Sequence, residues 1–240
     1  MKVRDKRREN IGRRRFVQSL GAVAGLTLAG CAGKAGEKGW FGAAPHAAAG
    51  LSGDVNPCED LMQEHGLLER ILLIYTEAAR RLDRRVAFDV AILNQTAAIT
   101  RRFVEDYHER LEEEYVFPRL EAAGRETGLI AVLRQQHERG RQLTDDIVRL
   151  CAAPRRKQKL PPLLRNFEHM YRPHAAREDT VLFPAFRALV GRAAYAELGQ
   201  AFEEQERNRL GTQGFEGTVQ EVAHIEDELG IGDLASFTVR

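Results

Sequence analysis

Apolar residues recur every three or four positions along most of the chain from Cys58 onward. The first such run lies between residues 59 and 82, with apolar side chains at Leu61, Met62, Leu68, Ile71, Leu72 and Tyr75. This spacing places them on one face of a helix. No stretch alternates apolar and polar residues as a half-buried strand would, so the pattern predicts an all-α protein.

The same periodicity predicts three more long helices. The second begins near Asp89, a residue suited to capping a helix, and ends before Gly124. The third runs from about residue 129 to 150 and the fourth from about 163 to 190, with kinks expected at Pro173 and Pro184. Two further helices follow, near residues 193–210 and 215–229. We therefore expect an antiparallel up-down four-helix bundle over residues 57–190 and a C-terminal helical extension over residues 191–240.

The N-terminal residues differ in character from the rest of the chain. Residues 1–15 are strongly basic, and a modest apolar run rich in Gly and Ala follows up to Gly30. This layout is typical of a signal peptide, and the run is too short for a comfortable membrane span. The stretch RRRFVQ (13–18) resembles a twin-arginine export motif, and LAGC (28–31) resembles a lipobox that ends in Cys31.

We therefore expect a signal peptide over residues 1–31, lipidation of Cys31 and a flexible tether over residues 32–56. The protein would then be exported to the cell envelope or periplasm and anchored to a membrane through Cys31. The alternative is a disordered basic tail. The formal net charge of the whole chain is only +1, so we expect no nucleic-acid partner.

An eleven-residue pattern occurs twice, as HERLEEEYVFP from His108 and as HAAREDTVLFP from His174. Both copies read H-x-x-x-E-x-x-x-x-F-P, so each places a histidine and a glutamate on one face of a helix, with an aromatic residue and a proline near its end. The other two predicted helices carry one central histidine each. The candidate metal ligands are His65, His108, Glu112, His137, His174 and Glu178.

Four helices that each present ligands to a common axis form the usual frame of a protein-bound dimetal site. Imidazoles and carboxylates without thiolates suit iron, manganese or zinc. A single histidine on an apolar face is more often a packed core residue, and a single H-x-x-x-E is often a surface pair. The duplication of the pattern, together with one histidine on each remaining helix, favours metal binding.

This arrangement resembles the hemerythrin-like HHE cation-binding family, over residues 58–190, and looks like one bacterial, exported branch of it. The resemblance implies a four-helix bundle with two non-haem iron ions; manganese or zinc would be less usual. By the same resemblance, His65 and His108 would be terminal ligands of one metal and His137 and His174 of the other. Glu112 and Glu178 would bridge them.

The resemblance also implies that O2, NO or peroxide is the small ligand. Two alternatives stay open: a di-iron oxidase, ferroxidase or peroxide-degrading enzyme, and a metal-stabilised structural or interaction module. Oxygen-carrying members usually have a second histidine four residues after the ligand of the third helix, where this chain has Arg141. Tyr171 and Glu69 are candidates to complete the coordination, although each suits an ordinary packing or surface role.

Overall fold

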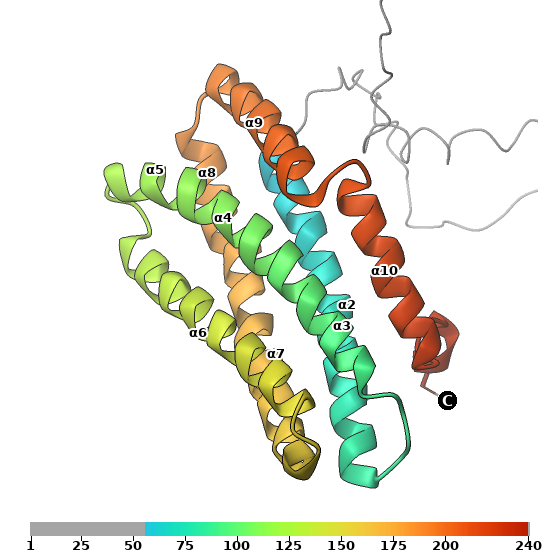
Figure 1. The fold of residues 1–240 in the computed structure, drawn as a ribbon. Coiled ribbons are helices and arrows are strands. Elements are labelled where there is room, and N and C mark those ends of the chain that lie inside the picture. The colour runs from blue at the N-terminus through green and yellow to red at the C-terminus, as the bar shows by residue number, and fades with distance from the viewer. Residues whose placement is uncertain (1–55, 240) are drawn as a thin grey trace, which may run out of the picture. The chain divides into compact units, whose positions relative to one another are not determined.

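The computed structural model describes residues 56–239, apart from the side chains of residues 154 and 155, and these residues contain helices but no strand (Figure 1). The predicted signal peptide, Cys31 and nearly all of the predicted tether lie outside them. Among residues 56–239, none of the helices combines the length and the apolar character that crossing a membrane requires. The prediction of an all-α bundle is confirmed.

Four long helices form the body of the structure. The first is α2 (Pro57–Arg84) and the third is α6 (Thr127–Cys151). The second runs without a break through α3 (Ala91–Ile99), η1 (Thr100–His108), α4 (Glu109–Leu111), η2 (Glu112–Val116) and α5 (Phe117–Ala122). The fourth follows the 3-10 turn η3 (Pro154–Lys159) and comprises α7 (Leu160–Arg177), η4 (Glu178–Leu182) and α8 (Phe183–Leu189).

Local signals set where the first two helices start and stop. The Asn56 side chain accepts a hydrogen bond from the backbone N–H of Glu59, and Pro57 occupies the first helical position, where its missing N–H costs nothing. Arg85 closes α2 in the left-handed conformation at φ 55°. Before α3, the Asp89 carboxylate accepts a hydrogen bond from the Ala91 N–H at 2.8 Å, as its predicted capping role requires.

The four long helices enclose one continuous apolar core. In the bundle α7 packs against both α2 and α6, α6 also packs against α3, and η1 packs against α2. Side chains from each helix are fully buried there, including Ile71, Phe103, Ile147 and Phe167. Burying an aliphatic or aromatic side chain of this size contributes about 1.5–3 kcal/mol, so this core is the main source of the fold's stability.

A widened, π-helical turn precedes each Phe-Pro pair. The N–H of Phe117 bonds to the carbonyl of Glu112, and the N–H of Phe183 bonds to that of Glu178, five residues back instead of four. The following residues, Pro118 and Pro184, have no N–H to donate. A π turn therefore leads into Pro184, where a kink is expected, and the helix continues beyond it as α8. Pro173 likewise lies inside α7, which runs on to Arg177.

The C-terminal extension consists of α9 (Arg192–Leu210), α10 (Gly214–Glu228) and a short 3-10 turn, η5 (Leu234–Phe237). It packs on the bundle and shares its core. Phe202 of α9 makes an edge-to-face contact with Tyr115, and Phe215 of α10 contacts Phe103. Arg70 of α2 donates to the Glu226 carboxylate of α10 from Nε at 3.0 Å. The extension therefore belongs to the folded unit.

Replacing Glu226 by Gln should lower the free energy of unfolding by about 1–3 kcal/mol, because the largely buried Glu226 is held by a charged hydrogen bond to Arg70. Urea denaturation measures this change. Glu228→Gln is the control, since within residues 56–239 Glu228 pairs only with the exposed His224, and we expect it to stay within about 0.5 kcal/mol of the parent. Equal effects of the two substitutions would contradict the anchoring role of Glu226.

Candidate metal centre

The structure brings all six candidate side chains together in the interior of the four-helix bundle. They form two groups in which one ligand atom per residue lies within 4.8 Å of the others. The first group adds His65 and His108 to Glu112 and Glu178, and the second adds His137 and His174 to the same two glutamates. We refer to His65 and His108 as the first pair, and to His137 and His174 as the second pair.

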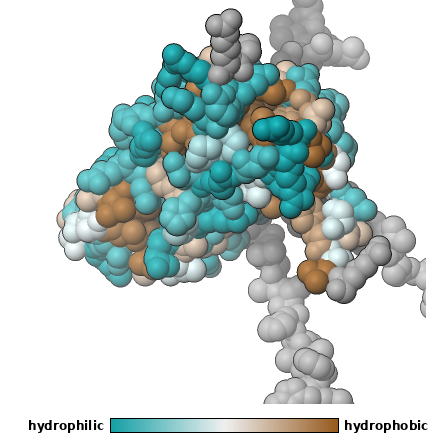
Figure 2. All heavy atoms as spheres, turned by 90° about the horizontal axis from the view of Figure 1, so that it is seen from below, coloured by the Kyte–Doolittle hydropathy of each residue, from teal (hydrophilic) through white to brown (hydrophobic). Residues whose placement is uncertain are grey.

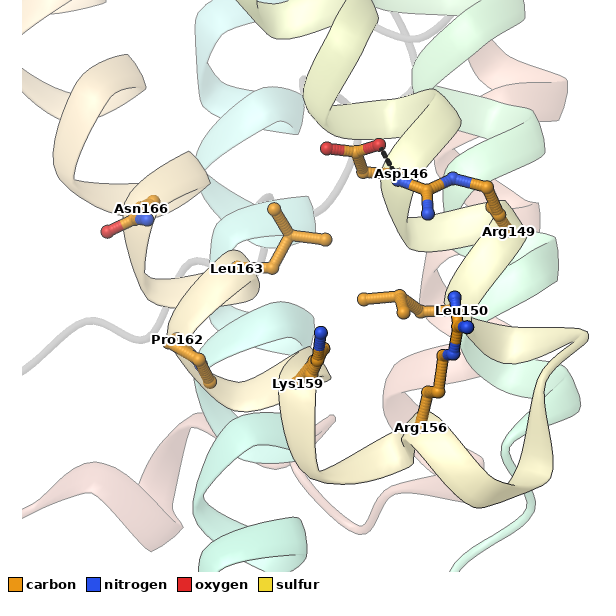
Figure 3. Close-up of a pocket in the computed structure, with 8 residues that line it drawn as sticks. All are labelled: Asp146, Arg149, Leu150, Arg156, Lys159, Pro162, Leu163 and Asn166. Carbon is orange, nitrogen blue, oxygen red and sulfur yellow. Dashed lines mark hydrogen bonds and ion pairs between the residues drawn. The ribbon is translucent and has the colours of Figure 1, made fainter.

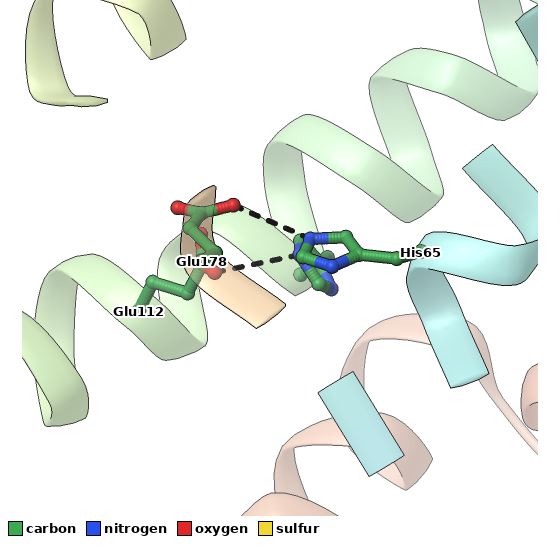
Figure 4. Close-up of side chains that lie close together, drawn as sticks. His65, Glu112 and Glu178 are labelled. Atoms are coloured by element: carbon green, nitrogen blue, oxygen red, sulfur yellow. Dashed lines mark hydrogen bonds and ion pairs between the residues drawn. The ribbon is translucent and has the colours of Figure 1, made fainter. Parts of the chain in front are cut away.

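Each glutamate faces one histidine from each pair. Oε2 of Glu178 lies 3.3 Å from Nε2 of His65 and 3.1 Å from Nε2 of His174. The carboxylate of Glu112 lies 3.6 Å from Nε2 of His108 through Oε1, and 3.4 Å from Nε2 of His137 through Oε2. Figure 4 shows the side chains of Glu112 and Glu178 on the same side of the His65 ring, with which Glu178 interacts. Both carboxylates therefore have the placement that bridging between two positions requires.

Both glutamates are fully buried, and within residues 56–239 none of their four carboxylate oxygens has a hydrogen-bond donor. Buried polar atoms are normally satisfied, and an uncompensated carboxylate is among the costliest groups to bury. Metal cations would satisfy these oxygens, and the donor set of four imidazoles and two carboxylates suits iron, manganese or zinc. The residues present therefore fit a pair of metal ions.

Burial and the neighbouring charges shift the pKa values of the two glutamates in opposite directions. Burial, together with the nearby Glu178 carboxylate, raises the pKa of Glu112 well above its ordinary value. Burial also acts to raise the pKa of Glu178, but the imidazoles of His174 and His65 outweigh it and hold that pKa well below its ordinary value. Two adjacent carboxyl groups in one buried site cannot both ionise freely unless cations compensate them.

Every histidine of the site is held through its second ring nitrogen. Nδ1 of His65 lies 2.7 Å from Asp179, and Nδ1 of His108 lies 2.9 Å from Glu64. These carboxylates accept a hydrogen bond from the Nδ1–H of each ring, so that Nε2 faces the glutamates and the other histidine of the pair. In the second pair, His137 donates to Glu113 at 3.0 Å and His174 donates to the amide oxygen of Gln136 at 2.9 Å.

These four acceptors were not predicted from the sequence. Glu113, which follows the candidate ligand Glu112 in a run of three glutamates, binds His137 and Arg141. A signal was present, because each acceptor is adjacent in sequence to a candidate ligand of its own helix. The histidine that it accepts from lies on another helix. The acceptors are Glu64, Glu113, Gln136 and Asp179, and they adjoin His65, Glu112, His137 and Glu178.

Arg141 stands at the position where a further histidine ligand is usual, and it makes ion pairs instead. Its Nη2 lies 2.8 Å from Glu109 and 2.8 Å from Glu113, so the guanidinium lies between the two carboxylates. The Tyr171 hydroxyl donates to the other oxygen of Glu109 at 2.8 Å. A hydrogen-bonded chain therefore runs from Tyr171 through Glu109, Arg141 and Glu113 to His137.

Neither residue considered for completing the coordination belongs to the two groups. Burial and the neighbouring Glu109 raise the pKa of Tyr171 well above its ordinary value, which keeps its hydroxyl protonated as a donor. The Tyr171 ring packs on His174 at 5.6 Å between centroids. Glu69 is partly exposed and pairs with Arg172 at 3.3 Å. The ordinary packing and surface roles hold for both.

The phenylalanines of the two repeats cover the site. Phe117 stacks on His137 with ring centroids 5.6 Å apart, and Phe183 stacks on His65 at the same separation. Both rings are fully buried. They limit the access of water to the imidazoles, as apolar residues around metal sites do.

A separate surface hollow of about 290 Å³ lies where α6, η3 and α7 meet (Figure 3). Cationic side chains line much of it, among them Arg149, Arg156 and Lys159, with Asp146 paired to Arg149. None of the six candidate ligands lines it, so this hollow is not part of the metal centre.

Residues 56–186 match the hemerythrin HHE cation binding domain, which spans the four long helices and all six candidate ligands. The chain belongs to this family. Three uncharacterized proteins, one from Mycobacterium bovis and two from strains of Mycobacterium tuberculosis, are each 42% identical to this chain over 234 residues. The match covers 95% of this chain and 91% of each relative. No solved structure matches the chain.

Membership of the hemerythrin HHE family gives cation binding a basis independent of the geometry. The six side chains that the structure gathers are a set of donors able to hold such a cation. The relatives match over nearly their whole length, so the C-terminal helices α9 and α10 are a shared part of these proteins.

Gly140→Ala should lower the free energy of unfolding by about 1–3 kcal/mol, because an added Cβ would overlap the Tyr171 hydroxyl oxygen. Thermal and urea unfolding measure the change. Gly66→Ala is the matched control: it is an exposed helical position where an added Cβ meets no atom of the described chain within 4 Å. We expect that variant to gain about 0.5–1 kcal/mol. A neutral Gly140→Ala would contradict the close packing of Tyr171.

Proposed function

We propose that the protein holds two non-haem iron ions at these six side chains and binds, or reacts with, O2, NO or peroxide. The observation that carries the proposal is the pair of buried glutamates, each facing one histidine from both pairs. Two carboxylates shared between two histidine pairs are the arrangement by which helical bundles hold two metals. Family membership adds cation binding to this argument.

The ligand set that each half offers supports iron as the proposed metal. Two imidazoles with carboxylate oxygens are the set that non-haem iron proteins use, and it leaves coordination positions open to an exogenous ligand. When bound, iron would supply redox chemistry and a place for such a ligand. The histidines hold their Nε2 atoms in place through their Nδ1 hydrogen bonds, and the two phenylalanines exclude bulk water.

Burial restricts the ligand to a small molecule. The four histidines are at most 4% exposed and both glutamates are fully buried. A substrate of the size of a metabolite would have no route to the Nε2 atoms without opening the bundle. Diatomic gases and peroxide are small enough, which favours them as the exogenous ligand.

The location in the cell stays a proposal that rests on the sequence. The twin-arginine stretch at residues 13–18 and the lipobox-like stretch ending at Cys31 support export to the cell envelope and membrane anchoring. Twin-arginine export carries folded proteins, so a site loaded with metal before export is compatible with this route. Loss of membrane association in a Cys31→Ser variant of the full chain would support the anchor.

Purified protein should contain about two iron ions per chain and show optical bands that differ between aerobic and anaerobic samples. Metal analysis and absorption spectra test this, with a Glu112→Gln, Glu178→Gln double variant as the control that should lose both. A full complement of zinc with less than one iron would contradict the di-iron proposal. Turnover of ferrous iron or peroxide by the loaded protein would identify an oxidase or peroxide-degrading enzyme instead of a binding protein.

Metal loading should also stabilise the fold, because the folded chain alone gathers the six ligands. At a free metal concentration of 100 times Kd, the gain is about 2.7 kcal/mol. Glu112→Gln, which keeps the shape of the side chain but removes its charge, should lose this gain. Glu197→Gln, at an exposed position of α9, should keep it. Thermal unfolding with and without iron measures the gain, and equal gains in the two variants would argue against Glu112 as a ligand.

A further inference from the structure

The two halves of the site correspond at more positions than those of the repeated H-x-x-x-E-x-x-x-x-F-P pattern. Gln63-Glu64-His65 of α2 corresponds to Gln135-Gln136-His137 of α6. Likewise, Glu112-Glu113 of η2 corresponds to Glu178-Asp179 of η4. In each case the residue beside a candidate ligand accepts the Nδ1 hydrogen bond of a histidine from a neighbouring helix.

The two halves differ in one of these acceptors, which is a carboxylate in the first half and an amide in the second. Glu64 accepts from His108 with a carboxylate oxygen at 2.9 Å, whereas its counterpart Gln136 accepts from His174 with an amide oxygen, also at 2.9 Å. The first pair of histidines is therefore backed by two carboxylates. The second pair is backed by one carboxylate and one neutral amide.

A second difference acts in the same direction. Glu113, the one carboxylate that backs the second pair, shares its Oε1 with Arg141 at 2.8 Å. The guanidinium brings a positive charge to this half and draws part of the carboxylate's charge away from His137. In the first half, Tyr107 donates a hydrogen bond from its hydroxyl to Glu64 at 2.9 Å.

Resting on the proposed function, we propose that the two metal positions are unequal: the first pair binds its metal first and tightly, and the second pair binds a weaker, exchangeable metal. A carboxylate behind an imidazole makes the ring a stronger donor, and an amide does so much less. Loss of one such acceptor typically changes metal affinity about 10–100-fold, so we expect the two steps to differ by a factor of that order.

The partial exposure of Asp179 to solvent does not reverse the expected order of the two metal affinities. The Asp179 side chain is 34% exposed, which weakens its effect on His65 through screening. It is still an anion at 2.7 Å, and the other backing residue of this half, Glu64, is 1% exposed. The neutral Gln136 supplies no charge at any degree of exposure.

Stepwise titration of the metal-free full chain with cobalt(II), against a chelator of known affinity, tests the inference. Cobalt(II) absorption bands report the coordination of each ion. We expect two steps whose dissociation constants differ about 10–100-fold. His174→Ala should remove the weaker step and keep the tighter one, and His108→Ala should do the reverse.

Two conservative variants test the cause without removing a ligand. Gln136→Glu should tighten the weaker step about tenfold or more and bring the two steps together. Gln135→Glu is its matched control, because it adds the same charge at an exposed neighbouring residue and should leave the ratio of the two constants unchanged. Asp179→Asn should weaken the tighter step. Circular dichroism confirms that each variant is folded.

The outcomes separate this inference from the proposed function. Two equal steps, or loss of the tighter step in His174→Ala, overturn the inequality while leaving metal binding intact. Equal effects of Gln136→Glu and Gln135→Glu overturn the role assigned to the backing amide. Absence of any cobalt(II) binding overturns the proposed function, and the inference with it.

Discussion

Two carboxylates buried among four imidazoles are the constraint on which the rest of the structure depends. In the described part of the chain, Glu112 and Glu178 lack hydrogen-bond donors, and burying them in this way is costly. The apolar core of the four long helices supplies the stability that tolerates the cost. The π turns, the stacked phenylalanines and the Nδ1 hydrogen bonds hold the surrounding groups in place. The most stable region of the protein thus encloses its least satisfied groups, as a site prepared for cations requires.

The acceptors behind the histidines explain how the bundle orients its candidate ligands. Each acceptor is adjacent in sequence to one candidate ligand and binds a histidine of another helix. Each of the four long helices therefore provides candidate ligands and also orients a histidine of a neighbouring helix. The four helices are therefore coupled through the site as well as through the core. Where the second half departs from the first, at Gln136 and Arg141, the departure lies in this layer and leaves the ligands themselves alike.

Much of this was predictable from the sequence, because helix periodicity and the i, i+4 rule act within one element. They predicted the helices to within a few residues and the pairing of His108 with Glu112 and of His174 with Glu178. Contacts between helices depend on their relative rotation and register, which one sequence does not state. The backing role of Glu113 and the ion pairs of Arg141 were therefore missed, and so was the π turn before Pro184.

The π turns have a consequence for how these segments can vary. In each, the phenylalanine N–H bonds to the glutamate carbonyl five residues back, so the turn holds one residue more than a turn of a regular α-helix. From the first position after the π turn, Phe117 stacks on His137 and Phe183 stacks on His65. The spacing of five positions from glutamate to phenylalanine is therefore set by the geometry of the centre. The residue after each glutamate is constrained as well, because Glu113 and Asp179 accept the Nδ1 hydrogen bonds of His137 and His65.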